Sequence, residues 1–265
     1  MNLILFEADE VVTDGSTETV SIGVNKDDRR YVHCTTILKV ESGSVCRVGI
    51  IGGDMHDARI EDLNSEGMKF VFNRTIVRPV RPQSDMNISL ILAMPRPKVL
   101  DRLWAVFAQL GFRRVMLINA ERVEKQYFHT HVVTESNYRP KLIKGLEQAS
   151  VSTRLPEVSV DKRALDVFLA KRLDVAFPPD KTNRFVCHPE SAEGTSVPSF
   201  DLSKETVIAL GPEGGWLDYE IAQLRERGFI PVTCSSRVFT TDVAVIALTA
   251  AITSRLDPVL LGGHI

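Results

Sequence analysis

A glycine-rich loop in the last quarter of the chain has the composition of a small-molecule binding site. Residues 206–210 are mostly β-branched or aliphatic and predict a buried strand, and the Gly-Pro-Glu-Gly-Gly run at 211–215 predicts a sharp turn directly after it. Positions without side chains let backbone groups approach a ligand closely. We expect a positive φ angle at Gly214, so that Gly214→Val would fill ligand space. An ordinary surface turn is the alternative for this run alone.

A second polar loop follows about twenty residues later. Its sequence, residues 237–244, reads Arg-Val-Phe-Thr-Thr-Asp-Val-Ala and leads into an apolar stretch that predicts a helix over 242–255. Arg237 could stabilise negative charge, and Asp242 could cap the helix or accept a proton. The two loops together predict a ligand cradle.

These two runs resemble the ribosomal RNA small subunit methyltransferase E family, the 16S ribosomal RNA uridine N3-methyltransferases of the knotted SPOUT superfamily. Weaker similarity lies at His33, at the turn around Gly43, and over residues 117–122 and 143–150. The resemblance implies an α/β fold with a SPOUT-type trefoil-knotted parallel sheet domain over residues 85–265 and a small PUA-like, RNA-binding β-barrel over residues 1–77. It also implies S-adenosylmethionine as cofactor, ribosomal RNA of the small subunit as substrate, and a homodimer.

The resemblance also implies which residues contact the cofactor. One loop would contact the adenosine and methionine parts, the opposite loop would close the site, and the end of an earlier strand would complete it. In that order the residues are Leu210, Gly211, Pro212, Glu213, Gly214 and Gly215; Cys234, Arg237, Val238 and Thr241; and Cys187 and His188.

Catalysis at uridine N3 needs help because the protonated ring nitrogen is a poor nucleophile. Arg237 is the first candidate for stabilising negative charge on the base or for contacting its phosphate. Asp242 stands where the family has Glu, and could orient Arg237, cap the last helix or assist proton removal. A purely structural N-cap is an equally good interpretation of Asp242.

Several family positions differ in this chain. The second arginine of the family's Arg-Val-Leu-Arg-Thr-Glu run is Thr240, and in the N-terminal His-x-x-Arg-Val-Leu-Arg run the arginines are Thr36 and Lys39. Missing arginines affect RNA docking more than cofactor binding. A SPOUT methyltransferase for a different RNA and a non-catalytic RNA-binding relative therefore stay open. A Rossmann dehydrogenase is disfavoured, since no Gly-x-Gly-x-x-Gly follows the first α/β strand.

The composition, 265 residues with 44% hydrophobic side chains, predicts a soluble globular protein. Without a membrane-length apolar run or a basic leader, we expect a cytoplasmic protein with no membrane partner. The four cysteines lack a Cys-x-x-Cys pair, which predicts reduced packing residues rather than a zinc or disulfide framework. His129 and His131 would share one face of a strand, but without a third ligand no metal site is predicted.

The charge distribution is uneven although the net charge is only −2. Residues 74–154 carry 14 Lys and Arg against 6 Asp and Glu, whereas the segments on either side are acidic. A basic surface can neutralise RNA phosphates, and a solvated face is the alternative. The basic residues are Arg74, Arg78, Arg81, Arg96, Lys98, Arg102, Arg113, Arg114, Arg122, Lys125, Arg139, Lys141, Lys144 and Arg154.

Periodicity predicts two architectures in succession. The first part shows short strands over residues 20–24, 32–40, 44–51, 57–62 and 69–77, which would close into a small barrel, and the proline-containing stretch 78–85 predicts a linker. The later part alternates strands at 87–93, 114–119, 157–160, 183–187, 205–210 and 230–233 with helices at 98–110, 138–150, 161–173, 218–227 and 242–255, and 189–204 predicts a mobile loop. This alternation predicts a parallel α/β sheet.

Overall fold

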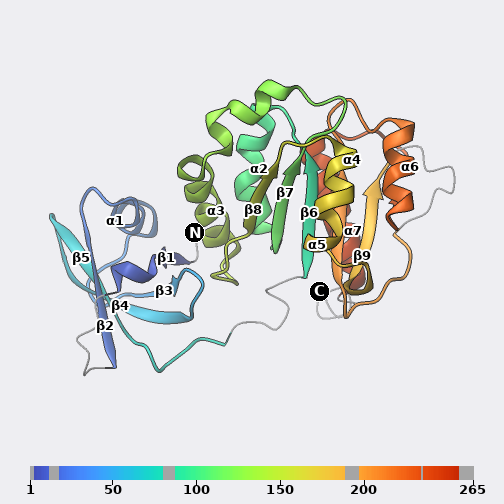
Figure 1. Cartoon of the computed structure of the whole chain (residues 1–265). Helices are drawn as coiled ribbons and strands as arrows, with labels where there is room; N and C mark the ends of the chain where they lie inside the picture. The colour runs from blue at the N-terminus through green and yellow to red at the C-terminus, as the bar shows by residue number, and fades with distance from the viewer. Residues whose placement is uncertain (1–2, 12–17, 80–86, 189–196, 234, 257–265) are drawn as a thin grey trace. The chain divides into compact units, whose positions relative to one another are not determined.

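The computed structural model of the protein describes residues 3–11, 18–79, 87–188, 197–233 and 235–256 (Figure 1). The chain forms two compact units. Unit 1 comprises Met1–Asp85 and Ile143–Leu155, and unit 2 comprises Met86–Leu142 and Pro156–Ile265. Unit 1 therefore contains a second segment, from the middle of the chain, that a simple division at residues 77–85 does not anticipate. The expected linker at 78–85 lies mostly outside the described residues.

Unit 1 is built on a curled five-stranded sheet in the order β1-β3-β4-β5-β2. All neighbouring strands are antiparallel except β1 and β3, which are parallel. Alternate side chains of β2, Val20, Ile22 and Val24, are buried, which is the pattern of a sheet with one face on a core. The strands are β1 (Ile4–Phe6), β2 (Thr19–Asn25), β3 (Val45–Ile50), β4 (Met55–Asn64) and β5 (Gly67–Asn73).

The strand predicted over residues 32–40 is wrong, because this stretch is helical. α1 (Arg29–His33) continues into a π-helical turn, Cys34–Leu38, and Lys39 ends it with a φ of 51°. The Asp28 side chain accepts a hydrogen bond from the Arg30 amide and so caps the helix start. Thr36, which favours strands by propensity, donates its hydroxyl to the Val32 carbonyl at 2.6 Å, and local capping therefore outweighs β-propensity here.

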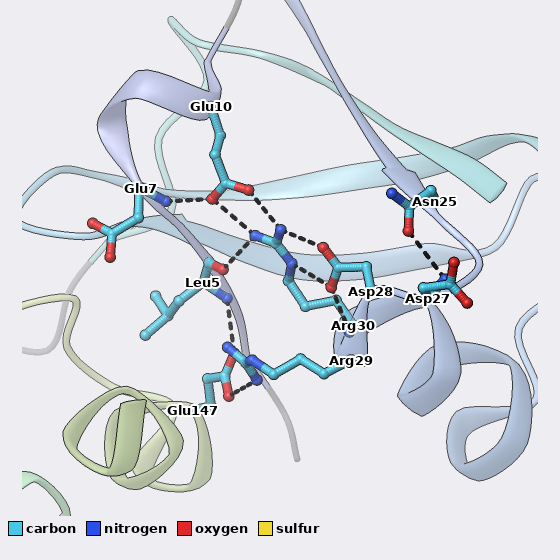
Figure 2. Close-up of polar contacts among 9 residues, drawn as sticks. All are labelled: Leu5, Glu7, Glu10, Asn25, Asp27, Asp28, Arg29, Arg30 and Glu147. Atoms are coloured by element: carbon cyan, nitrogen blue, oxygen red, sulfur yellow. Dashed lines mark hydrogen bonds and ion pairs between the residues drawn. The ribbon is translucent and has the colours of Figure 1, made fainter. Parts of the chain in front are cut away.

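Arg30 is the centre of a buried ion-pair cluster in unit 1 (Figure 2). Its guanidinium donates to Glu10 at 2.6 and 2.9 Å and to Asp28 at 2.6 and 2.9 Å. It also donates to the Leu5 carbonyl at 3.2 Å and lies 4.5 Å from the centre of the Phe6 ring. The cluster fixes α1 against the first strand of the sheet.

The second segment of unit 1 is joined to the first by polar contacts. Glu147, whose side chain is fully buried, accepts hydrogen bonds from Arg29 at 2.7 and 2.9 Å and from the Leu5 amide at 3.3 Å (Figure 2). Thr153 accepts a hydrogen bond from the Gly52 amide through its backbone carbonyl at 2.9 Å. These bonds make residues from the middle of the chain an integral part of unit 1.

Unit 2 contains a six-stranded sheet in the order β11-β9-β10-β6-β7-β8, in which every pairing is parallel. The central strands β6 and β10 are buried along their whole length, as expected for a sheet covered on both faces. The strands are β6 (Ile88–Ala93), β7 (Arg114–Ile118), β8 (Glu157–Asp161), β9 (Thr182–Cys187), β10 (Glu205–Leu210) and β11 (Ile230–Val232).

Helices cover both faces of this sheet. Figure 1 shows α4 and α5 in front of the sheet and α2 and α7 behind it. Trp104 of α2 is fully buried, and its indole N–H donates to the Val132 carbonyl at 2.9 Å. The helices that follow β6 in the chain are α2 (Pro97–Gln109), α3 (Glu135–Ala149), α4 (Leu165–Phe168), α5 (Asp174–Ala176), α6 (Asp218–Glu226) and α7 (Thr241–Leu256), with a π-helical turn at Leu169–Leu173.

Three further sequence predictions are wrong in detail. β5 ends at Asn73 rather than at residue 77, because the Asn73 side chain accepts from the Thr75 amide at 2.8 Å and forms a turn. The helix predicted from residue 161 begins only at Leu165, since Asp161 completes β8 and its carboxylate binds Arg163. Residues 125–129 and 131–133 form 3-10 helices, so the two histidines around residue 130 do not share a strand face.

Candidate active site

The glycine loop follows β10 directly and forms a tight turn. The Gly215 amide donates to the Pro212 carbonyl at 2.8 Å, and Gly215 has a φ of 74°, a conformation that favours glycine. A Cβ added at Gly215 would meet nothing within 4 Å. The expectation of a positive φ at Gly214 is wrong, because the strained position of the turn is one residue later, and a Cβ at Gly214 would meet the Arg122 side chain at 3.0 Å rather than open space.

Trp216 folds back over the start of the same loop. A Cβ at Gly211 would lie 3.0–3.2 Å from the indole ring, so glycine lets the ring pack here without having to shift by a few tenths of an ångström. Trp216 is 6% exposed, and within the described part of the chain its buried indole N–H has no hydrogen-bond partner. A buried donor without a partner is costly and is commonly found at functional sites.

The second loop lies between β11 and α7. Thr233 donates its hydroxyl to the Ser235 carbonyl at 2.7 Å, and the Ser235 hydroxyl accepts from the Arg237 amide at 3.0 Å. These bonds order the backbone and leave the Arg237 side chain exposed. Val238 is 83% exposed, whereas Thr241 is buried at the start of α7. The arginine is therefore presented by an ordered loop rather than held in a buried ion pair.

Both loops border one cavity of about 460 Å³ at the carboxyl ends of β9, β10 and β11. Ligands of open parallel sheets bind at this edge, and the volume suits a drug-sized or cofactor-sized molecule. The residues that line it are Cys187, Leu210, Gly211, Pro212, Glu213, Gly214, Gly215, Trp216, Thr233, Ser235, Arg237, Val238, Phe239, Thr240, Thr241 and Ala244.

Ten of the twelve residues expected to contact a cofactor lie in this lining. His188 is described but does not line the cavity, and Cys234 lies outside the described residues. Sequence reasoning did not select Trp216, Thr233, Ser235, Phe239, Thr240 or Ala244. The only feature of the sequence that could have indicated them is their position, since each lies within one of the two loops or at its end.

Asp242 lies at the first turn of α7, beside Thr240. Its carboxylate accepts from the Thr240 hydroxyl at 2.5 Å and from Arg102 of α2 at 3.1 Å. The Thr240 hydroxyl bond, with the Arg102 guanidinium, holds the pKa of Asp242 below its ordinary value although partial burial acts in the opposite direction. Asp242 is therefore a carboxylate at neutral pH and a weak base.

The chain matches the family model described as RNA methyltransferase domain over residues 82–253. It belongs to that family. This membership confirms the resemblance that the two loops indicated, and it assigns the cavity to a domain whose members modify RNA.

Individual relatives cover nearly the whole chain. The ribosomal RNA small subunit methyltransferase E of Treponema pallidum is 26% identical over 253 residues, which span 95% of this chain and 90% of that protein. Ribosomal RNA small subunit methyltransferase E 1 of Borreliella burgdorferi is 22% identical over 259 residues, 97% of this chain and 99% of that protein. Both units are therefore within the aligned region.

A solved structure shares the fold. The ribosomal RNA small subunit methyltransferase E from Neisseria gonorrhoeae bound to S-adenosyl methionine superposes with a TM-score of 0.68 at 17% identity, covering 96% of this chain and 97% of that one. The α/β class with a parallel sheet and a curled sheet is thus confirmed.

Some basic residues of the middle segment have structural roles. Arg114 forms an ion pair with Glu205, donates to the Ala176 carbonyl at 2.6 Å and lies 4.3 Å from the centre of the Phe177 ring, so it is not part of an RNA-facing surface. Arg154, in contrast, is exposed. The number of basic residues in segment 74–154 is therefore larger than the number that can face RNA.

Two properties of the described residues bear on other classes of function. No group of three or more His, Cys, Asp or Glu side chains in them is arranged to hold a metal ion. Among the same residues, no helix has the length and apolar character needed to cross a membrane.

Proposed function

We propose that the protein transfers a methyl group from S-adenosylmethionine to N3 of a uridine in 16S ribosomal RNA of the small subunit. The observation that carries this proposal is the single cavity at the carboxyl ends of β9, β10 and β11, bordered by the glycine loop and by the loop that presents Arg237. The curated relatives that align with 95% and 97% of this chain bear the name ribosomal RNA small subunit methyltransferase E.

The residues of the cavity suit S-adenosylmethionine. Gly215 leaves open space where a side chain would project, and the Trp216 indole N–H is a buried donor to which the described residues offer no acceptor. The lining also offers aliphatic and aromatic surface, including Leu210 and Phe239, to a purine ring. When bound, this cofactor supplies an electrophilic methyl group. The contribution of the chain is to bind, orient and exclude water around the reacting atoms.

Arg237 is the proposed catalytic residue. The N3 atom of uracil must lose its proton for methylation, and negative charge then spreads over the ring. A guanidinium at the rim of the cavity stabilises that charge or fixes the adjacent phosphate. Arg237 meets this requirement because it lines the cavity and its side chain is exposed to an incoming substrate.

Asp242 is proposed to act through its neighbours rather than as a strong base. Its lowered pKa and its bonds to Thr240 and Arg102 favour a carboxylate that orders the start of α7 and the end of the second loop. In this role it is a positioning residue for the Arg237 loop.

The proposal extends to the wider architecture of the family. We propose that the chain around β9, β10 and β11 forms the trefoil knot, that the curled sheet of unit 1 is a PUA-like barrel that binds RNA, and that two copies form a dimer. Support for dimerisation comes from α7, where Val243 and Ile246 are 46% and 47% exposed on one helical face next to the cavity loop. Apolar side chains spaced three apart on a helix favour packing against another protein surface.

Calorimetry with S-adenosylmethionine and with its demethylated product tests the cofactor assignment. We expect micromolar dissociation constants, equivalent to roughly −8 kcal/mol. Absence of binding and of thermal stabilisation at millimolar ligand would refute the methyltransferase proposal.

Nucleoside analysis of small-subunit RNA tests the target. We expect 3-methyluridine to form on 16S RNA, free or in assembled subunits, and a methylated nucleoside found only on another RNA would favour a different substrate. Arg237→Ala should retain cofactor affinity and slow single-turnover methylation about 10²-fold or more. The matched control is Arg225→Ala, which removes an exposed arginine from α6, outside the cavity lining. Equal rates for Arg237→Ala and the control would remove Arg237 from the mechanism.

A further inference from the structure

Arg122 contacts the glycine loop but does not line the cavity. It lies just after β7, and its guanidinium donates a hydrogen bond to the Gly214 carbonyl. The aliphatic part of the same side chain covers the Gly214 Cα, since a Cβ built there would lie 3.0 Å from Arg122 Cδ and 3.5 Å from its Cβ. Arg122 does not belong to the cavity lining. It contacts Gly214, which lines the cavity, without bordering the cavity itself.

Two further contacts from other segments fix the same region. The Glu213 carboxylate accepts from the Arg96 amide at 2.8 Å. Glu220, only 1% exposed, accepts from the Glu121 amide at 3.0 Å and from the Leu217 amide at 2.8 Å. The segments after β6 and β7 are therefore joined to the loop after β10 and to the first turn of α6 by charge-assisted hydrogen bonds, a strong type of polar contact.

The glycine loop needs such contacts from other segments because its own residues allow many backbone conformations. Glycine has more backbone conformations to lose on ordering than any other residue, and Gly214 and Gly215 are adjacent. Inside the loop, the bond from the Gly215 amide to the Pro212 carbonyl closes only one turn. A loop that must be ordered when a ligand arrives loses affinity by the cost of that ordering.

We infer that Arg122 is a positioning residue that preorganises the glycine loop for the cofactor, acting through Gly214. The inference rests on the proposed function, since it assigns the loop to cofactor binding. Arg122 does this by holding the Gly214 carbonyl and by packing its stem where a side chain at residue 214 would project. The geometry at Gly215 is then set before the ligand binds.

Cofactor affinity gives the first test. Arg122→Ala and Arg122→Met should each weaken binding of S-adenosylmethionine and of its demethylated product about tenfold, the loss expected for one charge-assisted hydrogen bond at a partly exposed site. The matched control is Lys125→Ala, which removes the same charge three residues later at an exposed position that does not line the cavity. It should leave affinity unchanged.

A double-mutant cycle tests whether the effect passes through Gly214. Gly214→Ala places a methyl group 3.0 Å from Arg122 Cδ and should weaken binding in the wild-type background. In the Arg122→Ala background the same substitution meets no obstacle, so its effect on affinity should be at least severalfold smaller. Equal effects in both backgrounds would show that the two residues act independently and would overturn the inference.

Amide hydrogen exchange without any ligand separates this inference from the proposed function. The Gly215 amide should exchange about tenfold faster in Arg122→Ala than in the wild type and in Lys125→Ala, because the turn opens more often. If the wild-type protein binds no cofactor, the proposed function fails. The exchange rates still test whether Arg122 orders the glycine loop. If the wild type binds cofactor and Arg122→Ala changes neither affinity nor exchange, the positioning role is refuted.

Discussion

Replacing Arg30 by Met should destabilise unit 1 by about 3 kcal/mol at neutral pH. The substitution keeps an apolar stem over Phe6 and removes the guanidinium, which makes five hydrogen bonds to Glu10, Asp28 and the Leu5 carbonyl. Breaking a buried ion pair from one side typically costs 3–5 kcal/mol. The lower end applies because the side chains of Glu10 and Asp28 are 32% and 21% exposed and regain some hydration.

Amide exchange of the strand core of unit 1 is the suitable assay. Both tryptophans, Trp104 and Trp216, belong to unit 2, so tryptophan fluorescence would not report on unit 1. A loss of about 3 kcal/mol corresponds to exchange roughly a hundredfold faster for amides that open only on global unfolding, and Phe70 of β5, a strand paired on both sides, is the expected reporter. Arg59→Met, at an exposed position of β4, is the matched control and should stay within about 0.5 kcal/mol of wild type.

The pH dependence of the stability difference between wild type and Arg30→Met tests whether that difference is electrostatic. Burial alone would raise the pKa of Glu10 and of Asp28, but the hydrogen bonds from Arg30 outweigh it and hold both pKa values below the ordinary 4.5 and 3.8. A lowered pKa in the folded state stabilises the protein above the ordinary pKa, and this stabilisation is lost as the pH falls through the lowered value. The difference between wild type and Arg30→Met should therefore be constant from pH 7 to about 5 and shrink below about 4.

A difference that stays the same down to pH 3 would show that the guanidinium acts through the Leu5 carbonyl and its cation–π contact with Phe6, and not through its carboxylate partners. A difference below about 1 kcal/mol at pH 7 would refute the assigned strength of the cluster.

Three further predictions concern the proposed active site and the dimer. Gly215→Ala, at a φ of 74°, should weaken cofactor binding about tenfold by calorimetry, since a left-handed backbone costs other residues roughly 1–2 kcal/mol; unchanged affinity would mean that the turn can relax. Val243→Lys combined with Ile246→Lys should convert the proposed dimer to the 29.5 kDa monomer in light scattering, and a persistent dimer would place the interface elsewhere. Because the pKa of Asp242 lies below its ordinary value, a role that needs its carboxylate should persist as the pH falls from 8 to 5; a fall in single-turnover methylation over that range that disappears in Asp242→Asn would contradict this.

The strands β6, β7 and β10 of unit 2 were predictable because each is a largely apolar run bounded by turn residues. β10 has the predicted bounds, Glu205–Leu210, and β6 and β7 differ from prediction by a single residue at one end. In unit 1 the same reasoning failed at residues 32–40, where a helix capped by Asp28 runs through β-branched residues and the Thr36 hydroxyl is satisfied by the Val32 carbonyl. It also missed β1, whose three residues are too few to show alternation and which is defined by pairing with β3.

The candidate site was predictable as a pair of loops but not in its internal geometry. The family resemblance selected the residues around Gly211 and Arg237, because both runs match the motifs of that family, whereas the glycine run alone is equally typical of a surface turn. The distinct roles of Gly214 and Gly215 depend on one φ angle and on Arg122, which lies 92 residues away in the sequence. Similarly, no local pattern pairs Asp242 with Arg102, 140 residues earlier. Such partners arise only when the sheet brings distant segments together.

The second segment of unit 1 has a consequence for biosynthesis. Leu5 and Arg29 leave the ribosome 142 and 118 residues before their partner Glu147, so the first sheet cannot acquire these bonds while only its own strands have been translated. A nascent chain that ends after β5 would expose the Leu5 amide and an unpaired Arg29. Maturation of the N-terminal unit therefore waits for synthesis of more than half of the polypeptide, and a fragment cut at residue 79 would be a poor substitute for that unit in isolation.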